Sequence, residues 1–123
     1  MRIKHVIRTK AQMREFLRQI KGSGGQVQTS DGRRASWRLS HSAPGSIEIS
    51  EQPENSEPIY VMTRDISAEG LGFLSHQNLE EDQELFLTIE TDGGELEVPG
   101  TVIHSTVTVG GYKIGVKFIF EDR

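Results

Sequence analysis

The stretch ELFLTIETDGG, residues 84–94, contains the clearest strand and turn of this 123-residue chain. Leu85, Leu87 and Ile89 alternate with mostly polar neighbours, so one face of an extended strand would be apolar. Asp92-Gly93-Gly94 then supplies residues that tolerate the backbone angles of a tight hairpin. The stretch therefore predicts a half-buried β-strand that turns back on an antiparallel neighbour.

Further short strands are predicted on both sides of this hairpin. The segment 51–58 is acidic and carries two prolines, so it cannot be a central strand. Gly110-Gly111 predicts another turn, and Pro99-Gly100 predicts a bulge or a sheet edge. Six short strands at regular spacing are typical of a mainly β fold, and we expect a small six-stranded antiparallel β-barrel. The expected strands are Ser46–Ser50, Ile59–Asp65, Gly70–Ser75, Glu84–Glu90, Leu96–Ser105 and Tyr112–Phe120.

One α-helix is predicted before the strands, over Thr9–Lys21. Thr9 is expected to cap its start, with Gln12 as the capping-box partner three residues later. Gly22–Gly25 is typical of a flexible joint, so we divide the chain into a basic N-terminal arm, residues 1–32, and a barrel domain, residues 33–123. Helical spacing places four apolar residues on one stripe: Met13, Phe16, Leu17 and Ile20.

Length and composition limit the class of protein. The chain is long enough for one domain and too short for two ordinary ones. It has no cysteine, no membrane-spanning apolar run and no secretory signal, so we expect a cytoplasmic protein without disulfides or thiolate metal sites. Residues 1–38 carry ten Lys and Arg against two acidic residues, whereas residues 39–123 carry four against sixteen. Such a basic arm either meets an anionic partner or pairs with its own acidic body, and both remain open.

Two short motifs carry the chemistry. Arg34 and Arg38 form an Arg-x-x-x-Arg motif in the segment that leads into the barrel. Guanidinium groups suit phosphates and guanine edges because they present planar forks of donors. Asp65, Ser67 and Gly70 form the second motif, in which a carboxylate can accept hydrogen bonds from a base, a hydroxyl can bond a phosphate oxygen, and a glycine allows close approach. Together the motifs predict a site for a small anionic nucleotide.

Each motif also has a purely structural interpretation. Arg14 and Arg18 repeat the spacing of the first motif inside the helix, where a solvated face is expected. In the second motif, Asp65 and Ser67 could cap backbone donors of a hairpin while Gly70 supplies a positive φ angle. Such a turn is compatible with ligand binding.

In this order, the two motifs resemble the signature of PilZ domains, bacterial receptors for cyclic di-GMP. The resemblance covers residues 33–120 and extends to Leu71-Gly72-Phe73 after the second motif. It also includes Gly115-Val116-Lys117-Phe118, which is similar to the closing strand of these barrels. The chain departs from the family at 41–58, which is longer and more polar than the same stretch in many relatives.

The resemblance implies a role for each motif residue. The arginines would grip phosphates and contact guanine, the carboxylate and hydroxyl would read a guanine edge and anchor the ligand, and the glycine would leave room for it. Arg64 is expected to point to the face opposite Asp65, since strand neighbours alternate. Trp37 is expected to anchor the arginine loop on the barrel. The implied residues for cyclic di-GMP are Arg34, Arg38, Asp65, Ser67 and Gly70, with Arg33 as an additional candidate.

The expected function is a non-catalytic receptor in which residues 22–38 are mobile without ligand, close over cyclic di-GMP and signal to a partner protein. The alternative is a protein-interaction or assembly module with the same barrel that does not depend on nucleotide. An enzyme is not expected, because no nucleophile, general base or metal cluster is recognisable and the four histidines are scattered. Neither DNA nor RNA is expected as a partner, because the barrel is acidic and aromatic residues make up only 7% of the chain.

Overall fold

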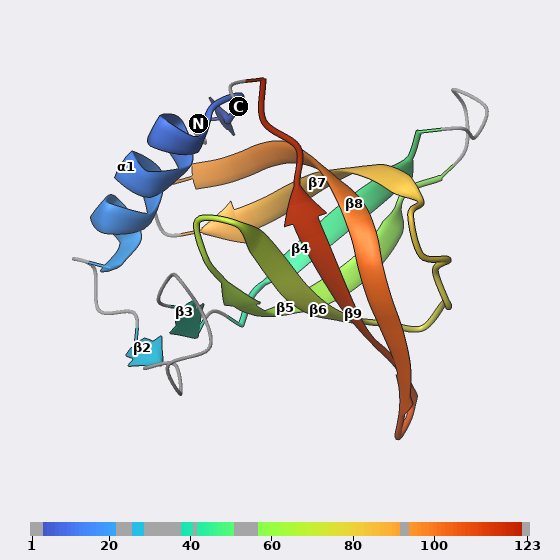
Figure 1. Ribbon diagram of the computed structural model, residues 1–123. Helices are drawn as coiled ribbons and strands as arrows, with labels where there is room; N and C mark the ends of the chain where they lie inside the picture. The colour runs from blue at the N-terminus through green and yellow to red at the C-terminus, as the bar shows by residue number, and fades with distance from the viewer. Residues whose placement is uncertain are drawn as a thin grey trace.

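The computed structural model describes residues 4–21, 26–28, 38–40, 42–50, 57–91 and 94–121. Side chains are described for these residues except at 20–21, 26–28 and 38–40. Within this part, Figure 1 shows a barrel of strands with one helix packed against it, which confirms the expected mainly β architecture. No helix in this part is long and apolar enough to cross a membrane.

Six antiparallel strands close the barrel. Neighbouring strands follow the order β5-β4-β7-β8-β9-β6, and β6 pairs with β5 to complete the circle. All six expected strands are present, with bounds close to the expected ones. They are β4 Pro44–Ile49, β5 Ile59–Ile66, β6 Gly70–Ser75, β7 Glu84–Thr91, β8 Gly94–Thr108 and β9 Gly111–Phe118.

Both predicted glycine hairpins are confirmed by the strand register. The last pair of β7 and β8 is Thr91 with Gly94, where the sequence predicts the Asp-Gly-Gly turn. The last pair of β8 and β9 is Thr108 with Gly111. Gly110 between them has a φ angle of 83°, a conformation that favours glycine because it has no Cβ atom.

Pro99 lies in β8 at a change of partner. Strand β1, Lys4–Val6, pairs in parallel with the segment of β8 before Pro99, whereas β9 pairs with the segment after it. Proline has no backbone N–H group. It is tolerated at such a point because no hydrogen bond of the sheet requires that group. The irregularity in register lies between Val102 and His104, so the predicted bulge occurs further along β8 than Pro99-Gly100.

The inward faces of the strands form the hydrophobic core. Leu85, Leu87 and Ile89 of β7 are at most 1% exposed, as their alternation predicts. Phe73 of β6 and Ile114 of β9 are fully buried in the same cluster. This burial fixes the register of each strand, because a shift by one residue would turn its apolar side chains to solvent.

Helix α1, Lys10–Lys21, begins at the predicted cap. Gln12 N donates to Thr9 Oγ1 over 3.1 Å, and Thr9 N donates to Gln12 Oε1 over 3.1 Å. Both halves of the capping box are therefore formed. The side chain of Ile20 lies outside the described ones. The stripe residues that are buried in the same core as the strands are Met13, Phe16 and Leu17.

The sequence does not predict three short strands, namely β1, β2 (Gln26–Gln28) and β3 (Arg38–Ser40). Runs of three residues are too short to give an alternation pattern. Strand β2 pairs with β3, and β3 pairs with β5. Lys4 Nζ lies 3.4 Å from Glu97 Oε1, so part of the basic arm pairs with the acidic body. The arm and the barrel share one core, and the division at residue 32 stays a prediction.

Candidate functional site

The two sequence motifs approach each other where β3 pairs with β5. Leu39 lies opposite Ile66, and Ser40 lies opposite Asp65. Arg38 precedes Leu39 in this antiparallel pair, so its backbone lies beside the turn that follows Ile66 (Figure 1). The end of the first motif is thereby next to the start of the second.

The arginine residues are only partly described. Arg38 is the first residue of β3, where the sequence suggests a loop. Arg33, Arg34 and Trp37 lie outside the described residues, as does the side chain of Arg38. The roles expected for these residues, and the expected mobility of residues 22–38, stay predictions.

A β-bulge turns two neighbouring charged residues toward one hollow. The pairing of β5 with β6 shifts register between Thr63 and Asp65, which leaves Arg64 as the extra residue. Arg64 and Asp65 both line a hollow of about 270 Å³ on the barrel surface. The expectation that Arg64 points to the face opposite Asp65 is therefore wrong, because the bulge interrupts the alternation of the strand.

Ser67 holds the turn between β5 and β6. This residue is only 4% exposed. Its Oγ accepts the N–H groups of Glu69 at 3.2 Å and of Gly70 at 3.3 Å, and its own N–H donates to Gly70 O at 2.9 Å. The hydroxyl therefore satisfies backbone donors, as the structural interpretation of the motif expects. A direct contact between Ser67 and a ligand stays a prediction.

Gly70 allows two strands to approach closely. A Cβ atom at this position would overlap the carbonyl oxygen of Val116 on β9. The described glycines with positive φ angles are Gly94 and Gly110, so the positive φ expected at Gly70 is wrong. Glycine is needed there for space against a neighbouring backbone. Room for a ligand beside Gly70 stays a prediction.

A row of four residues crosses the outer face of the barrel from β5 to β8. Asp65 lies opposite Gly72, and Gly72 lies opposite Gly115. Gly115 in turn lies opposite His104. A Cβ atom at Gly72 would lie 2.9 Å from Asp65 Oδ1, and one at Gly115 would overlap the His104 imidazole. The carboxylate and the imidazole therefore lean over the two glycines from opposite ends.

Sequence reasoning did not identify His104 as a member of this site. The residue comes almost forty positions after Asp65, and only the pairing of four strands brings it to the same row. The scattered histidines of the sequence gave no reason to prefer it over His76. The sequence marks Gly72 and Gly115 only through the family resemblance, and their pairing follows from the barrel register.

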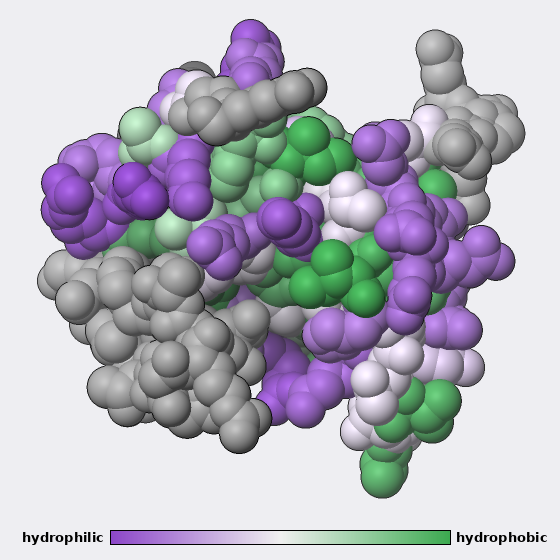
Figure 2. Space-filling model, in the orientation of Figure 1, coloured by the Kyte–Doolittle hydropathy of each residue, from purple (hydrophilic) through white to green (hydrophobic). Residues whose placement is uncertain are grey.

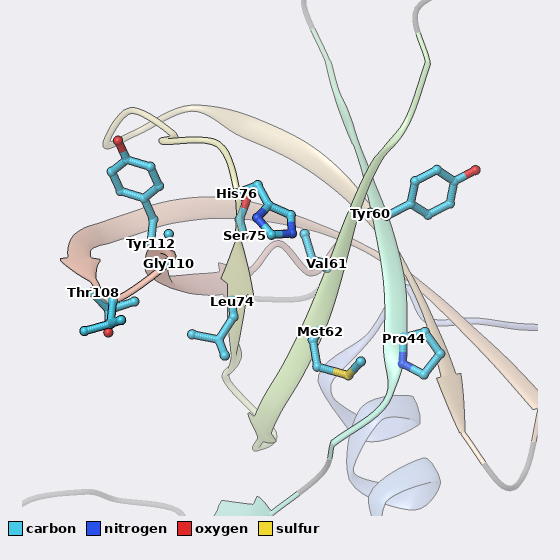
Figure 3. Close-up of a pocket in the computed structure, with 12 residues that line it drawn as sticks. Pro44, Tyr60, Val61, Met62, Leu74, Ser75, His76, Thr108, Gly110 and Tyr112 are labelled. Atoms are coloured by element: carbon cyan, nitrogen blue, oxygen red, sulfur yellow. The ribbon is translucent and has the colours of Figure 1, made fainter.

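A larger hollow, of about 500 Å³, lies away from the described motif residues. Its wall includes Met62 of β5 and Leu74 of β6, which are paired and lie beside each other in Figure 3. Tyr60 at its edge is 74% exposed. Figure 2 shows apolar side chains at the lower end of the β8–β9 hairpin, where Val107 and Val109 are exposed. This surface is apolar, in contrast to the charged hollow beside Asp65.

The match to known families covers the barrel and both motifs. The model of the PilZ domain matches residues 32–123. The solved structure of the K. pneumonia MrkH–c-di-GMP complex is similar to this chain, with a TM-score of 0.56 at 17% sequence identity, which shows a shared fold. The similarity covers 79% of this chain and 56% of the other, so this chain spans just over half the length of that protein. No curated protein matches this chain.

Proposed function

Because this chain belongs to the PilZ domain family, we propose that it is a non-catalytic receptor for cyclic di-GMP that signals to a partner protein. The family match includes both motifs, from Arg34 to Gly70. The MrkH structure of similar fold is itself a complex with c-di-GMP. Both findings support the same ligand class as the chemistry of the motifs.

The pairing of β3 with β5 is the observation that carries this proposal. It brings the strand that begins with Arg38 against the strand that contains Asp65, although the two motifs lie far apart in the sequence. Arg34 and Arg38 would bind phosphates, since guanidinium groups form bidentate, charge-assisted hydrogen bonds with them. Asp65 would accept hydrogen bonds from guanine. Ser67 and Gly70 would keep the turn in shape beside the ligand.

Binding would become a signal through helix α1. Closing the segment that carries Arg34 and Arg38 over a ligand costs conformational entropy, so we expect moderate affinity and a large change in this segment. The same segment joins α1 to β3, and α1 packs Met13, Phe16 and Leu17 into the barrel core. Movement of the segment would shift the helix and alter the surface that a partner protein meets.

A catalytic role has less support. In the part of the chain that the structure describes, no three His, Asp or Glu side chains gather in a way that could hold a metal ion. The hydroxyl of Ser67, the serine of the motif, accepts hydrogen bonds from backbone N–H groups of its own turn. A binding function needs neither feature.

Calorimetric titration with cyclic di-GMP tests the proposal. Arg34→Ala and Arg38→Ala should each weaken binding about tenfold or more, which corresponds to about 1.4 kcal/mol, because each removes charge-assisted hydrogen bonds. Arg14→Ala is the matched control, since Arg14 is exposed on α1 and belongs to the same basic arm. GTP and cyclic di-AMP serve as control ligands.

Two results would contradict the proposal. One is the absence of cyclic di-GMP binding by the unaltered protein. The other is an equal loss in Arg14→Ala and Arg34→Ala, which would indicate diffuse attraction by the basic arm instead of a defined site.

The second candidate function is a protein-interaction module that does not depend on nucleotide. The exposed apolar surface around Tyr60, Met62 and Leu74 favours it, because such surfaces mark contact regions in many soluble proteins. A protein that fails to bind cyclic di-GMP in the titration, yet folds normally by circular dichroism, would favour this function over the first.

A further inference from the structure

The hollow beside Asp65 has a floor of two paired glycines. Gly72 of β6 and Gly115 of β9 lie opposite each other and carry no side chains, and the Asp65 carboxylate and the His104 imidazole lean over them from the two ends. Asp65 stands at one end of this floor, and His104 stands at the other. Neighbouring strands lie about 4.8 Å apart, so the backbones of β5 and β8 are about 14 Å apart across three strand spacings. Both side chains line the hollow of about 270 Å³ that remains there.

The walls of the hollow concentrate positive charge. Residues 39–123 contain only four Lys and Arg residues. Two of them, Arg64 and Lys113, line the hollow. Within the described residues, neither makes an ion pair. Among the described residues that line the hollow, Asp65 is the only acidic one. On a barrel that is acidic as a whole, this local excess of cationic groups suits an anionic ligand.

The imidazole of His104 lies directly on the floor. Three of its ring atoms, Nε2, Cε1 and Cδ2, occupy the space that a Cβ atom at Gly115 would take. The ring therefore packs on the backbone of β9, while the residue as a whole is exposed. An aromatic ring held in this way offers a flat surface to a purine base, and such stacking is a common mode of nucleotide recognition.

We propose that His104 and Lys113 form the far wall of the cyclic di-GMP site. A ligand that begins at Asp65 would extend across the hollow, stack a guanine on the His104 ring above Gly115 and bring a phosphate near Lys113. Arg64 would add a second cationic contact from the bulge in β5. This inference rests on the proposed function and assigns to the site three residues that lie outside both sequence motifs, namely His104, Lys113 and Arg64.

Calorimetric titration of two variants tests this inference. His104→Ala should weaken cyclic di-GMP binding about fivefold or more, because it removes a stacking surface. His104→Phe should bind nearly as well as the unaltered protein, because a phenyl ring also stacks. Lys113→Gln should weaken binding severalfold and reduce its dependence on ionic strength, because the lost charge attraction is screened by salt.

Matched controls separate the hollow from the rest of the surface. His76→Ala removes an exposed histidine that lines the other hollow, and Lys117→Gln removes an exposed lysine of β9 that lines neither hollow. Both should bind like the unaltered protein. Thermal melts should show that all variants fold, since the altered side chains are exposed.

The outcomes distinguish this inference from the function on which it rests. If the unaltered protein binds and both His104→Ala and Lys113→Gln bind equally well, the far wall is refuted while the receptor function stands. If His104→Phe loses as much as His104→Ala, stacking is refuted. If the unaltered protein does not bind cyclic di-GMP, both proposals fail.

Discussion

Gly70 and Gly72 lie two residues apart in β6 and face different neighbours. Gly70 faces the carbonyl group of Val116, a backbone atom that the barrel register holds in place. Gly72 faces the carboxylate of Asp65, a side chain that can rotate away. The same added methyl group should therefore affect stability at one position and the binding site at the other.

Gly70→Ala should lower the free energy of unfolding by about 1–3 kcal/mol, because the methyl group forces β6 and β9 apart. Urea denaturation measures this loss as a shift of the midpoint, provided that the free energy of unfolding depends on urea concentration with the same slope in both proteins. Gly72→Ala is the control, and its stability should change less. Similar losses in both variants would show that the Asp65 side chain is as rigid as the backbone of β9.

The roles of individual residues could be predicted from the sequence where the signal is local. Asp65 and Ser67 are recognisable because their offsets are those of a turn, and the hydrogen bonds of Ser67 confirm that turn. The position of Arg64 could not be predicted, because a bulge depends on the partner strand. His104 could not be assigned either, because its place beside Gly115 follows from the closure of the barrel.

At the scale of elements, α1 was predictable because its signals lie within a few residues of each other. The capping box spans Thr9 and Gln12, and the apolar stripe repeats once per turn. The barrel strands were predictable for the same reason, since their alternation is local. Strands β1 and β3 were not, because their short segments become strands only through pairing with β8 and β5.

Thr9→Ala should destabilise the protein by about 1 kcal/mol, because it leaves the first-turn N–H of Gln12 without its side-chain acceptor. For a domain of this length, we expect the melting temperature to fall by about 3–6 °C. Arg14→Ala on the exposed side of the same helix should change it by much less. A loss of the same size in Arg14→Ala would show that helix propensity, and not the cap, sets the effect.

At the scale of the whole molecule, the chain runs from α1 to β3, and β3 pairs with β5 beside the turn that contains Ser67. Addition of cyclic di-GMP should increase the hydrogen-exchange protection of amides in residues 30–40, because the segment closes on the barrel. Amides of α1 should also change, since the helix is joined to this segment and packed into the core. Hydrogen exchange with mass spectrometry resolves both regions.

The pattern of exchange separates binding from signalling. Unchanged exchange in residues 30–40 at saturating ligand would refute the closing of the segment. A change in this segment without any change in α1 would leave the binding site intact and refute the helix as the route to a partner protein. Arg34→Ala at the same ligand concentration is the control, and it should show neither change.

The pairing of β1 with β8 delays completion of the fold during synthesis. Ile7 N donates to Glu97 O over 2.9 Å, and Glu121 N donates to Arg8 O over 2.8 Å, so the first described residues bond to some of the last (Figure 1). A ribosome that adds about 5–20 residues per second makes Glu97 roughly 5–20 seconds after Val6. Until then the core that the apolar side chains of α1 share with the barrel is incomplete, so part of this apolar surface stays exposed on the nascent chain.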